Sequence, residues 1–189
     1  SSRGLGRVMA TRLAHMGASV VLHGTRPDSP KSFNEGHSMD QVAQEISEQT
    51  GSPALPVWGD VTDPGEVKRV ADEIRAHFGQ IDILVNNAGM NIREPIDEVS
   101  EDHFDQIVGV NLKGLYFLSQ RVARHMQARR QGKIINIGSL TTGYALAKVS
   151  VYGATKGAVG QITRAQAVEF GPHNIQVNAI CPGFVVTPL

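Results

Sequence analysis

The sequence predicts an α/β fold, a doubly wound parallel sheet with helices on both faces. Two observations lead to this prediction. Short apolar or β-branched segments alternate with longer segments of helical period, and small or amide residues follow directly where several of the short segments end. The 189 residues, 41% of them hydrophobic, suffice for one buried core, so we expect a single domain over residues 1–189.

Each element follows from the local pattern. The strands are predicted at residues 19–23, 55–61, 81–85, 133–137 and 175–180. The helices are predicted at residues 5–16, 39–50, 66–78, 101–128 and 151–170. The 101–128 segment has the clearest helical period, and Ser100 stands before it as a candidate N-cap. Because parallel strands end at one edge of a sheet, the loops after them should carry the functional site.

Composition excludes several classes of function. The chain has 18 Lys plus Arg and 18 Asp plus Glu, so it lacks the basic field that nucleic-acid or anionic-membrane binding needs. Its one cysteine, Cys181, forms no internal disulfide, which fits a reducing, cytoplasmic compartment. The histidines are not spaced for a metal site, and no apolar segment approaches the roughly 18 residues of a membrane helix. We therefore expect neither metal, nucleic acid nor membrane as a partner.

A glycine-containing segment, residues 1–6 (SSRGLG), opens the first expected helix. Such glycines let a pyrophosphate approach the backbone N–H groups at the helix start, although a plain turn or cap has the same pattern. About 20 residues on, where an acid would bind a ribose 2′-hydroxyl, the chain has Gly24, followed closely by Arg26. The missing acid favours NADP over NAD, since Arg3 and Arg26 could bind a 2′-phosphate. Alternatively, both arginines are solvated and Asp28, or the loop after it, binds the ribose.

Tyr152 and Lys156 stand four residues apart on the expected 151–170 helix, so their side chains share one face. A lysine cation beside a phenol favours the phenolate, which can take up a proton during catalysis. This spacing arises by chance in roughly one such chain in ten, so it needs support. Ser139, after the 133–137 strand, adds a hydroxyl that could hydrogen-bond a reacting oxygen. The plainer alternatives make Ser139 a turn cap and Tyr152 an ordinary aromatic at a helix start.

These segments together resemble the short-chain dehydrogenase/reductase superfamily over essentially the whole chain. Residues 1–6 resemble the end of the family's TGxxxGxG loop. The other matching motifs are Asp60 with Val61, residues 86–89 (NNAG), residues 111–114 (NxxG), Ser139 with Tyr152 and Lys156, and residues 182–187 (PGxxxT). The resemblance implies a Rossmann-like fold and an NAD(P)-dependent interconversion of a secondary alcohol and a ketone.

The resemblance also implies roles for single residues. Tyr152 would be the general acid/base, and Lys156 would favour its ionised form and bind the nicotinamide ribose. Ser139 would orient the substrate oxygen. Asn111 would hold a water that links Lys156 to solvent. A second explanation of Asn111 is that it interrupts the hydrogen bonding of its helix.

The resemblance places the cofactor against residues from both halves of the chain. These are Ser2, Arg3, Leu5, Thr25, Arg26, Asp60, Val61, Asn87, Ala88, Gly89, Val110, Pro182, Gly183, Val185 and Thr187, besides Tyr152 and Lys156. For two of them a structural explanation stays open: Asp60 could cap the helix that starts near Pro64, and Thr187 could be an ordinary loop hydroxyl.

The chain also departs from the family pattern. The Thr and first Gly of TGxxxGxG are not present, nor are the strand before them and the family's last strand. Without that first strand, the 19–23 and 81–85 strands would lack a shared neighbour, and we expect the parent protein to be longer at both ends. Residues 27–38 form a polar loop that is longer than usual, with no role assigned.

Short segments of the sequence indicate a class of substrate. Residues 91–95 (NIREP) and 149–152 (VSVY), with the ending TPL, look like those of sugar-acid and polyol dehydrogenases of the gluconate 5-dehydrogenase type. A 3-oxoacyl-thioester reductase is the alternative enzyme. A non-catalytic dinucleotide sensor or a methyltransferase on a similar sheet would have no use for the Ser, Tyr and Lys. In the family the helices corresponding to 101–128 and 151–170 pack across a dimer axis, so a homodimer or homotetramer is expected.

Overall fold

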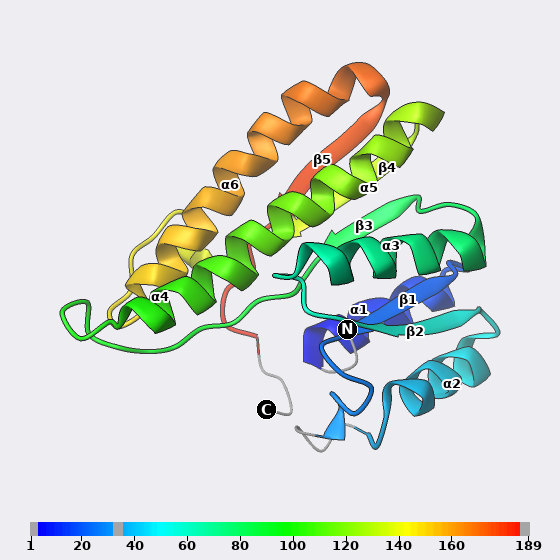
Figure 1. The fold of residues 1–189 in the computed structure, drawn as a ribbon, viewed down its shortest axis with the longest axis horizontal. Helices are drawn as coiled ribbons and strands as arrows, with labels where there is room; N and C mark the ends of the chain where they lie inside the picture. The colour runs from blue at the N-terminus through cyan, green and yellow to red at the C-terminus, as the bar shows by residue number, and fades with distance from the viewer. Residues whose placement is uncertain (1–3, 32–35, 186–189) are drawn as a thin grey trace. The chain divides into compact units, whose positions relative to one another are not determined.

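The computed structural model describes residues 4–31 and 36–185, so Ser2, Arg3 and Thr187 lie outside the described residues. The chain divides into two compact units, Ser1–His77 with Val186–Leu189, and Phe78–Val185. Each unit is described by itself, and Figure 1 gives the course of the chain through both.

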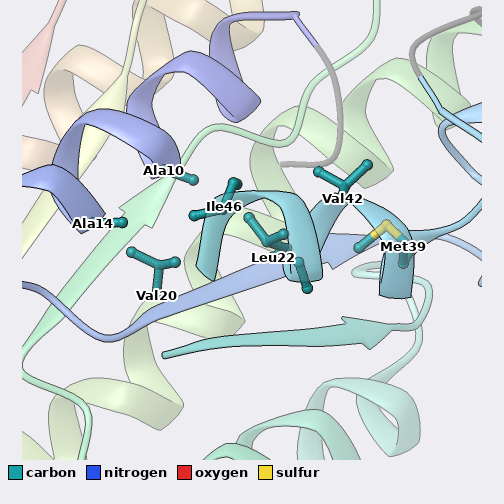
Figure 2. Packing of buried hydrophobic residues seen from close by; sticks show 8 residues of the cluster. Ala10, Ala14, Val20, Leu22, Met39, Val42 and Ile46 are labelled. Carbon is teal, nitrogen blue, oxygen red and sulfur yellow. The ribbon is translucent and has the colours of Figure 1, made fainter. Parts of the chain in front are cut away.

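The first unit contains a two-stranded parallel sheet. Its elements are α1 (Gly4–His15), β1 (Val20–Gly24), α2 (Met39–Thr50), β2 (Ala54–Trp58) and α3 (Pro64–Phe78), whose last residue begins the second unit. β1 pairs with β2, and α2 makes the crossover that parallel strands require. Ser38 caps α2 by accepting a hydrogen bond from the Gln41 N–H, and Gly51 ends it in a left-handed conformation, φ 73°. Figure 2 shows apolar side chains from α1, β1 and α2 meeting around Leu22 in the core of this unit.

The second unit contains a three-stranded parallel sheet in the order β3–β4–β5. Its elements are β3 (Ile83–Asn86), α4 (Glu101–Val108), the π-helical segment η2 (Gly109–Gly114), α5 (Leu115–Arg129), β4 (Gly132–Ile137), the 3₁₀ turn η3 (Leu140–Thr142), α6 (Ser150–Phe170), the 3₁₀ turn η4 (Gly171–His173) and β5 (Ile175–Ile180). The long helices α5 and α6 run along this sheet (Figure 1). Val122 and Met126 of α5 pack against Ile134 of β4 and Ile175 of β5 in one buried cluster.

A network of buried side-chain hydrogen bonds joins the sheet of the second unit to its helices. Asn86 Nδ2 on β3 donates to Ser119 Oγ on α5 and to Asn136 Oδ1 on β4, each at 2.8 Å. Asn136 Nδ2 in turn donates to Thr163 Oγ1 at 2.9 Å and Gln166 Oε1 at 3.3 Å, both on α6. Because all five side chains are buried, each bond satisfies a group that water does not reach.

The prediction of an α/β fold with parallel strands is confirmed. Each unit has its own ladder of strands. Within residues 4–31 and 36–185, the 19–23 and 81–85 strands share no neighbouring strand, as expected. Most predicted ends agree with the structure within two residues, but two elements differ more. The 55–61 strand ends at Trp58, because the backbone after it turns around Asp60, whose carboxylate accepts from the Thr62 N–H. The 101–128 helix is interrupted by η2. The single domain over residues 1–189 stays a prediction.

Within the described residues, no helix combines the length and the apolar character needed to cross a membrane.

Candidate active site

Tyr152 and Lys156 lie on the first turns of α6, and the helix brings their side chains together. The Lys156 Nζ atom is 5.6 Å from the centroid of the Tyr152 ring. Lys156 is only 5% exposed, and its Nζ donates a 2.7 Å hydrogen bond to the carbonyl of Ile137, the last residue of β4. Burial lowers the pKa of Lys156, because the ammonium form loses its hydration. The carbonyl uses one of the three Nζ hydrogens, so the amine can also serve other groups.

Ser139 follows β4 after a single glycine and caps the turn η3. Its Oγ accepts a 3.2 Å hydrogen bond from the Thr141 N–H, and its own N–H donates to Thr142 Oγ1 at 3.1 Å. The structure therefore bears out the plainer alternative, in which Ser139 is a turn cap. Capping is compatible with a chemical role, because a hydroxyl that accepts one bond keeps its own hydrogen to donate to a substrate oxygen.

Gly138 lets the end of β4 approach the end of β5. A Cβ atom at this position would lie 2.8 Å from both Cys181 Sγ and Thr142 Oγ1, which leaves no room for a side chain. The Gly138 N–H donates to the Ile180 carbonyl, and the Leu140 N–H donates to the Pro182 carbonyl, each at 2.8 Å. The predicted contact Pro182 is thus bonded to the turn that carries Ser139. Gly183 and Val185 follow it and are exposed.

Asn111 lies in the π-helical segment and is 1% exposed. Its Oδ1 accepts from the Met90 N–H at 2.8 Å, while its Nδ2 donates to the Met90 carbonyl at 2.9 Å and to Thr155 Oγ1 at 3.2 Å. The structure agrees with the alternative in which Asn111 interrupts its helix, since the α-helical pattern gives way to a π turn around it, a feature frequent at functional sites. Both Nδ2 hydrogens are used, so a water held by Asn111 would bond to the other lone pair of Oδ1 or to the backbone carbonyl.

The loop after β3 passes beside Asn111 and Lys156. A Cβ atom built on Gly89 would lie 3.4 Å from Asn111 Oδ1 and 3.7 Å from Lys156 Nζ. A side chain at position 89 would therefore touch both the Asn111 amide and the Lys156 amine. Asn87 and Ala88 precede it on the same loop, and Val110 is half-buried beside Asn111. A position without a side chain next to a buried cation is compatible with the approach of a hydroxyl-bearing group such as a ribose.

The remaining predicted cofactor residues that the structure describes belong to the first unit. Leu5 lies in the first turn of α1 and is half-buried. Asp60 and Val61 follow β2, and Asp60 Oδ1 accepts hydrogen bonds from the N–H and the hydroxyl of Thr62. The alternative that Asp60 caps the next helix is wrong. Asp63 Oδ1 accepts the first N–H groups of α3 instead.

Thr25 and Arg26 follow β1, also in the first unit. Both are exposed, and the Arg26 guanidinium lies 3.7 Å from the Asp28 carboxylate. A Cβ atom at Gly24 would lie 2.9 Å from Met39 Sδ. An acidic side chain at position 24 would therefore require its neighbours to move.

His23 joins the ends of β1 and β2. Its Nε2 lies 2.9 Å from the Gly59 carbonyl oxygen, and burial lowers the pKa of His23 to about 4. At neutral pH the ring is uncharged and donates Nε2–H to that carbonyl.

The chain matches the family model for short chain dehydrogenase over residues 1–189. It belongs to the short-chain dehydrogenase family. It is 38% identical to gluconate 5-dehydrogenase of Gluconobacter oxydans (strain 621H) over 189 residues, which cover 100% of this chain and 70% of that protein. As a short-chain dehydrogenase it is an NAD(P)-dependent oxidoreductase that acts on CH–OH groups.

Solved structures give the same assignment. A gluconate 5-dehydrogenase from Burkholderia cenocepacia J2315, crystallised with NADP and tartrate, is 37% identical and has a TM-score of 0.86, with 97% of this chain and 68% of that chain covered. An NAD⁺-bound xylitol dehydrogenase is 29% identical with a TM-score of 0.86, covering 95% of this chain and 65% of that chain. The fold of this short-chain dehydrogenase is thus shared with enzymes that bind either nucleotide.

The sequence analysis missed residues that support the site without lying in a family motif. Thr155 is one of them: its hydroxyl donates to the Tyr152 carbonyl at 2.7 Å and accepts from Asn111. Its place directly before Lys156 was visible in the sequence. Its hydrogen bond with Asn111, 44 residues away, was not visible.

Proposed function

We propose that this short-chain dehydrogenase interconverts a ketone and a secondary alcohol on a sugar acid, with Tyr152 as the general acid/base. One observation carries the catalytic part of the proposal. The buried ammonium of Lys156 lies 5.6 Å from the centre of the Tyr152 ring and is fixed there by the Ile137 carbonyl. A cation held at this place stabilises the phenolate that remains when Tyr152 gives up its proton.

The roles of the side chains follow from their free hydrogen-bonding groups. The nicotinamide cofactor, when bound, gives or takes the hydride. Tyr152 donates its phenolic proton to the substrate oxygen during reduction and takes it back during oxidation. Ser139 donates the hydroxyl hydrogen that its capping bond leaves free, which orients the same oxygen. Lys156 offers its remaining hydrogens to the phenol and to the ribose, in the space beside Gly89.

A sugar acid carries a carboxylate, and two exposed cations stand near the start of α6. Arg93 lies in the loop after β3, and Lys148 lies four residues before Tyr152. The Glu94 N–H donates to the Lys148 carbonyl at 3.0 Å, so the two segments that carry these cations are joined. Charge-assisted hydrogen bonds from either cation would select an acid over a neutral polyol. The name of the relative gluconate 5-dehydrogenase supports the same substrate class.

We further propose that NADP(H) is preferred over NAD(H). Position 24 is a glycine packed against Met39, so the acid that would repel a 2′-phosphate is missing there. Arg26, exposed after β1, offers a guanidinium to such a phosphate. We expect Arg26→Ala to weaken NADPH binding by about 10-fold or more and to leave NADH binding nearly unchanged. Equal affinity of the unaltered protein for both nucleotides, measured by fluorescence titration, would remove the preference.

We also propose that the protein is a homodimer or homotetramer built on α5 and α6. Tyr116 and Phe117 of α5 are 44% and 48% exposed and stack edge to face at 5.3 Å. On α6, the small residues Gly153 and Gly157 help to line a surface cavity of about 320 Å³. Exposed aromatic and small residues on neighbouring helices suit helix packing against a second copy. Phe117→Glu should lower the mass measured by light scattering, whereas Ile96→Glu, at a residue 76% exposed on a loop, should not.

The single cysteine Cys181 supports a cytoplasmic location.

The central test compares wild type with Tyr152→Phe. Oxidation of NADPH is followed with a panel of keto-acids, keto-sugars and acyl-thioester ketones. We expect turnover with a keto sugar acid and a loss of at least about 100-fold in kcat for Tyr152→Phe, with nucleotide binding retained. Turnover that survives this substitution would refute the mechanism, and a preference for acyl-thioester ketones would refute the substrate class.

A further inference from the structure

Thr142 bonds to the backbones of two candidate catalytic residues through a single hydroxyl. Its Oγ1 accepts the Ser139 N–H at 3.1 Å and donates to the Lys156 carbonyl at 3.1 Å. The first bond is local and belongs to the capping box of the turn η3. The second bond is not local: it joins that turn to α6 across 14 residues of sequence.

The surroundings of Thr142 leave its side chain little freedom. A Cβ atom at Gly138 would lie 2.8 Å from Thr142 Oγ1, and a Cβ atom at Gly160 would lie 2.8 Å from Thr142 Cγ2. Two positions that carry no side chain therefore border the hydroxyl and the methyl of one threonine. Both atoms of Thr142 are held, the hydroxyl by hydrogen bonds and the methyl by close packing against α6.

We infer that Thr142 is a positioning residue, which holds the Ser139 turn at a fixed place relative to the Tyr152 and Lys156 turn of α6. The inference rests on the proposed function, in which Ser139 and Tyr152 act on one substrate oxygen. Ser139 stands on the loop after β4, whereas Tyr152 and Lys156 stand on a helix, so their relative position depends on contacts between the two elements. The Thr142 hydroxyl is a direct bond between them. Displacements of about 1 Å between catalytic groups can cost about 100-fold in rate.

Thr141 provides a matched control in the same turn. It is 6% exposed, and within the described part of the chain its Oγ1 has no hydrogen-bond partner. Thr→Val keeps the shape of the side chain and removes only the hydroxyl. The same substitution at positions 141 and 142 therefore removes an unpartnered hydroxyl in one case and the bridging hydroxyl in the other.

The experiment measures kcat, KM, nucleotide affinity and the urea midpoint for Thr142→Val, Thr142→Ser and Thr141→Val in the full-length protein. We expect Thr142→Val to lower kcat by about 10- to 100-fold, while KM and the Kd of NADPH change by less than about threefold. Thr142→Ser, which keeps the hydroxyl, should stay within about threefold of wild type, and so should Thr141→Val. A wild-type kcat for Thr142→Val, or equal losses in Thr142→Val and Thr142→Ser, would overturn the inference.

A second pair of variants tests the packing of the methyl group. Gly160→Ala should push Thr142 away through the added Cβ and lower kcat, and Thr142→Ser in the same chain should restore it, because serine lacks the displaced methyl. Failure of this rescue would also overturn the inference. Tyr152→Phe distinguishes failure of the proposed function from failure of the positioning role of Thr142. If it is active, the proposed function fails. If it is inactive while every Thr142 variant is fully active, only the positioning role fails.

Discussion

Gly89→Ala tests whether the space beside the Lys156 amine is a nucleotide site. The new methyl group would lie 3.4 Å from Asn111 Oδ1 and 3.7 Å from Lys156 Nζ, which are ordinary van der Waals distances. Gly89 is also not among the glycines with positive φ, so alanine fits its backbone. We therefore expect the free energy of unfolding to change by less than about 0.5 kcal/mol.

The effect on nucleotide binding should be much larger. The methyl group stands where a ribose hydroxyl would meet the ammonium, and a lost charge-assisted hydrogen bond costs about 1.5 to 3 kcal/mol. This corresponds to an increase of about 10- to 100-fold in the Kd of NADPH, measured by fluorescence titration. Gly171→Ala is the matched control, since a Cβ there has nothing within 4 Å. An unchanged Kd in Gly89→Ala, with a normal urea midpoint, would refute the assignment of this space to the cofactor.

Three further predictions concern stability. Asn136→Ala should lower the free energy of unfolding by about 3 kcal/mol, because it opens a cavity and leaves Gln166 Oε1 without its 3.3 Å partner. Lys156→Met should abolish turnover without lowering that free energy. Burying the ammonium costs several kcal/mol in lost hydration. The hydrogen bond to the Ile137 carbonyl returns only about 1.5 to 3 kcal/mol of stabilisation, so removing the charge does not destabilise the fold. Because the pKa of His23 falls to about 4 on folding, the unfolded chain binds more protons than the folded chain between about pH 4 and 6.5. The free energy of unfolding therefore decreases as the pH is lowered through this range. Between pH 7 and 5 the loss is about 2 kcal/mol, and His23→Gln should remove it.

Each of these predictions has a control of the same residue type. Asn178, Lys133 and His15 are exposed, so Asn178→Ala, Lys133→Met and His15→Gln should each change the free energy of unfolding by less than about 0.5 kcal/mol. Urea titration provides the measurement, at one fixed pH for the Asn136 and Lys156 variants and at a series of pH values between about 7 and 5 for the His23 variant. A loss below 1 kcal/mol in Asn136→Ala, or a clear loss in Lys156→Met, would contradict the energetic reasoning. An unaltered pH dependence in His23→Gln would show that this ring is not the group that titrates.

Much of the fold was visible in the sequence because it depends on local patterns. The 175–180 strand and the 39–50 helix have the predicted ends, and the four-residue spacing of Tyr152 and Lys156 predicted their shared face. An interruption of the helix at Asn111 was considered from the sequence, but its π-helical form was not visible. Apolar residues continue through it at helical spacing, while the contact that accompanies it is made by the Asn111 amide with the Met90 backbone, 21 residues away.

The candidate site was predictable in its residue types and not in its connections. Ser139 could be placed at the end of a strand, but its capping bonds depend on how the chain turns after Gly138. The link from Thr142 to Lys156 joins two elements whose packing no short sequence window contains. Side chains that act through such distant partners are recognised only when the tertiary structure is known.

The groups that hold this site in place are largely main-chain atoms. Lys156 is bonded to the carbonyl of Ile137, Asn111 to both backbone groups of Met90, and Thr155 to the carbonyl of Tyr152. Main-chain carbonyls are present whatever the side chain. Substitutions at Ile137 or Met90 therefore keep these hydrogen-bond partners as long as the path of the backbone is unchanged. Under the proposed mechanism, the residues of nearby loops, such as 91–95 and 144–148, can accordingly be exchanged to accommodate new substrates without rebuilding the proposed proton-transfer residues. Libraries designed to change specificity should therefore diversify these loops first.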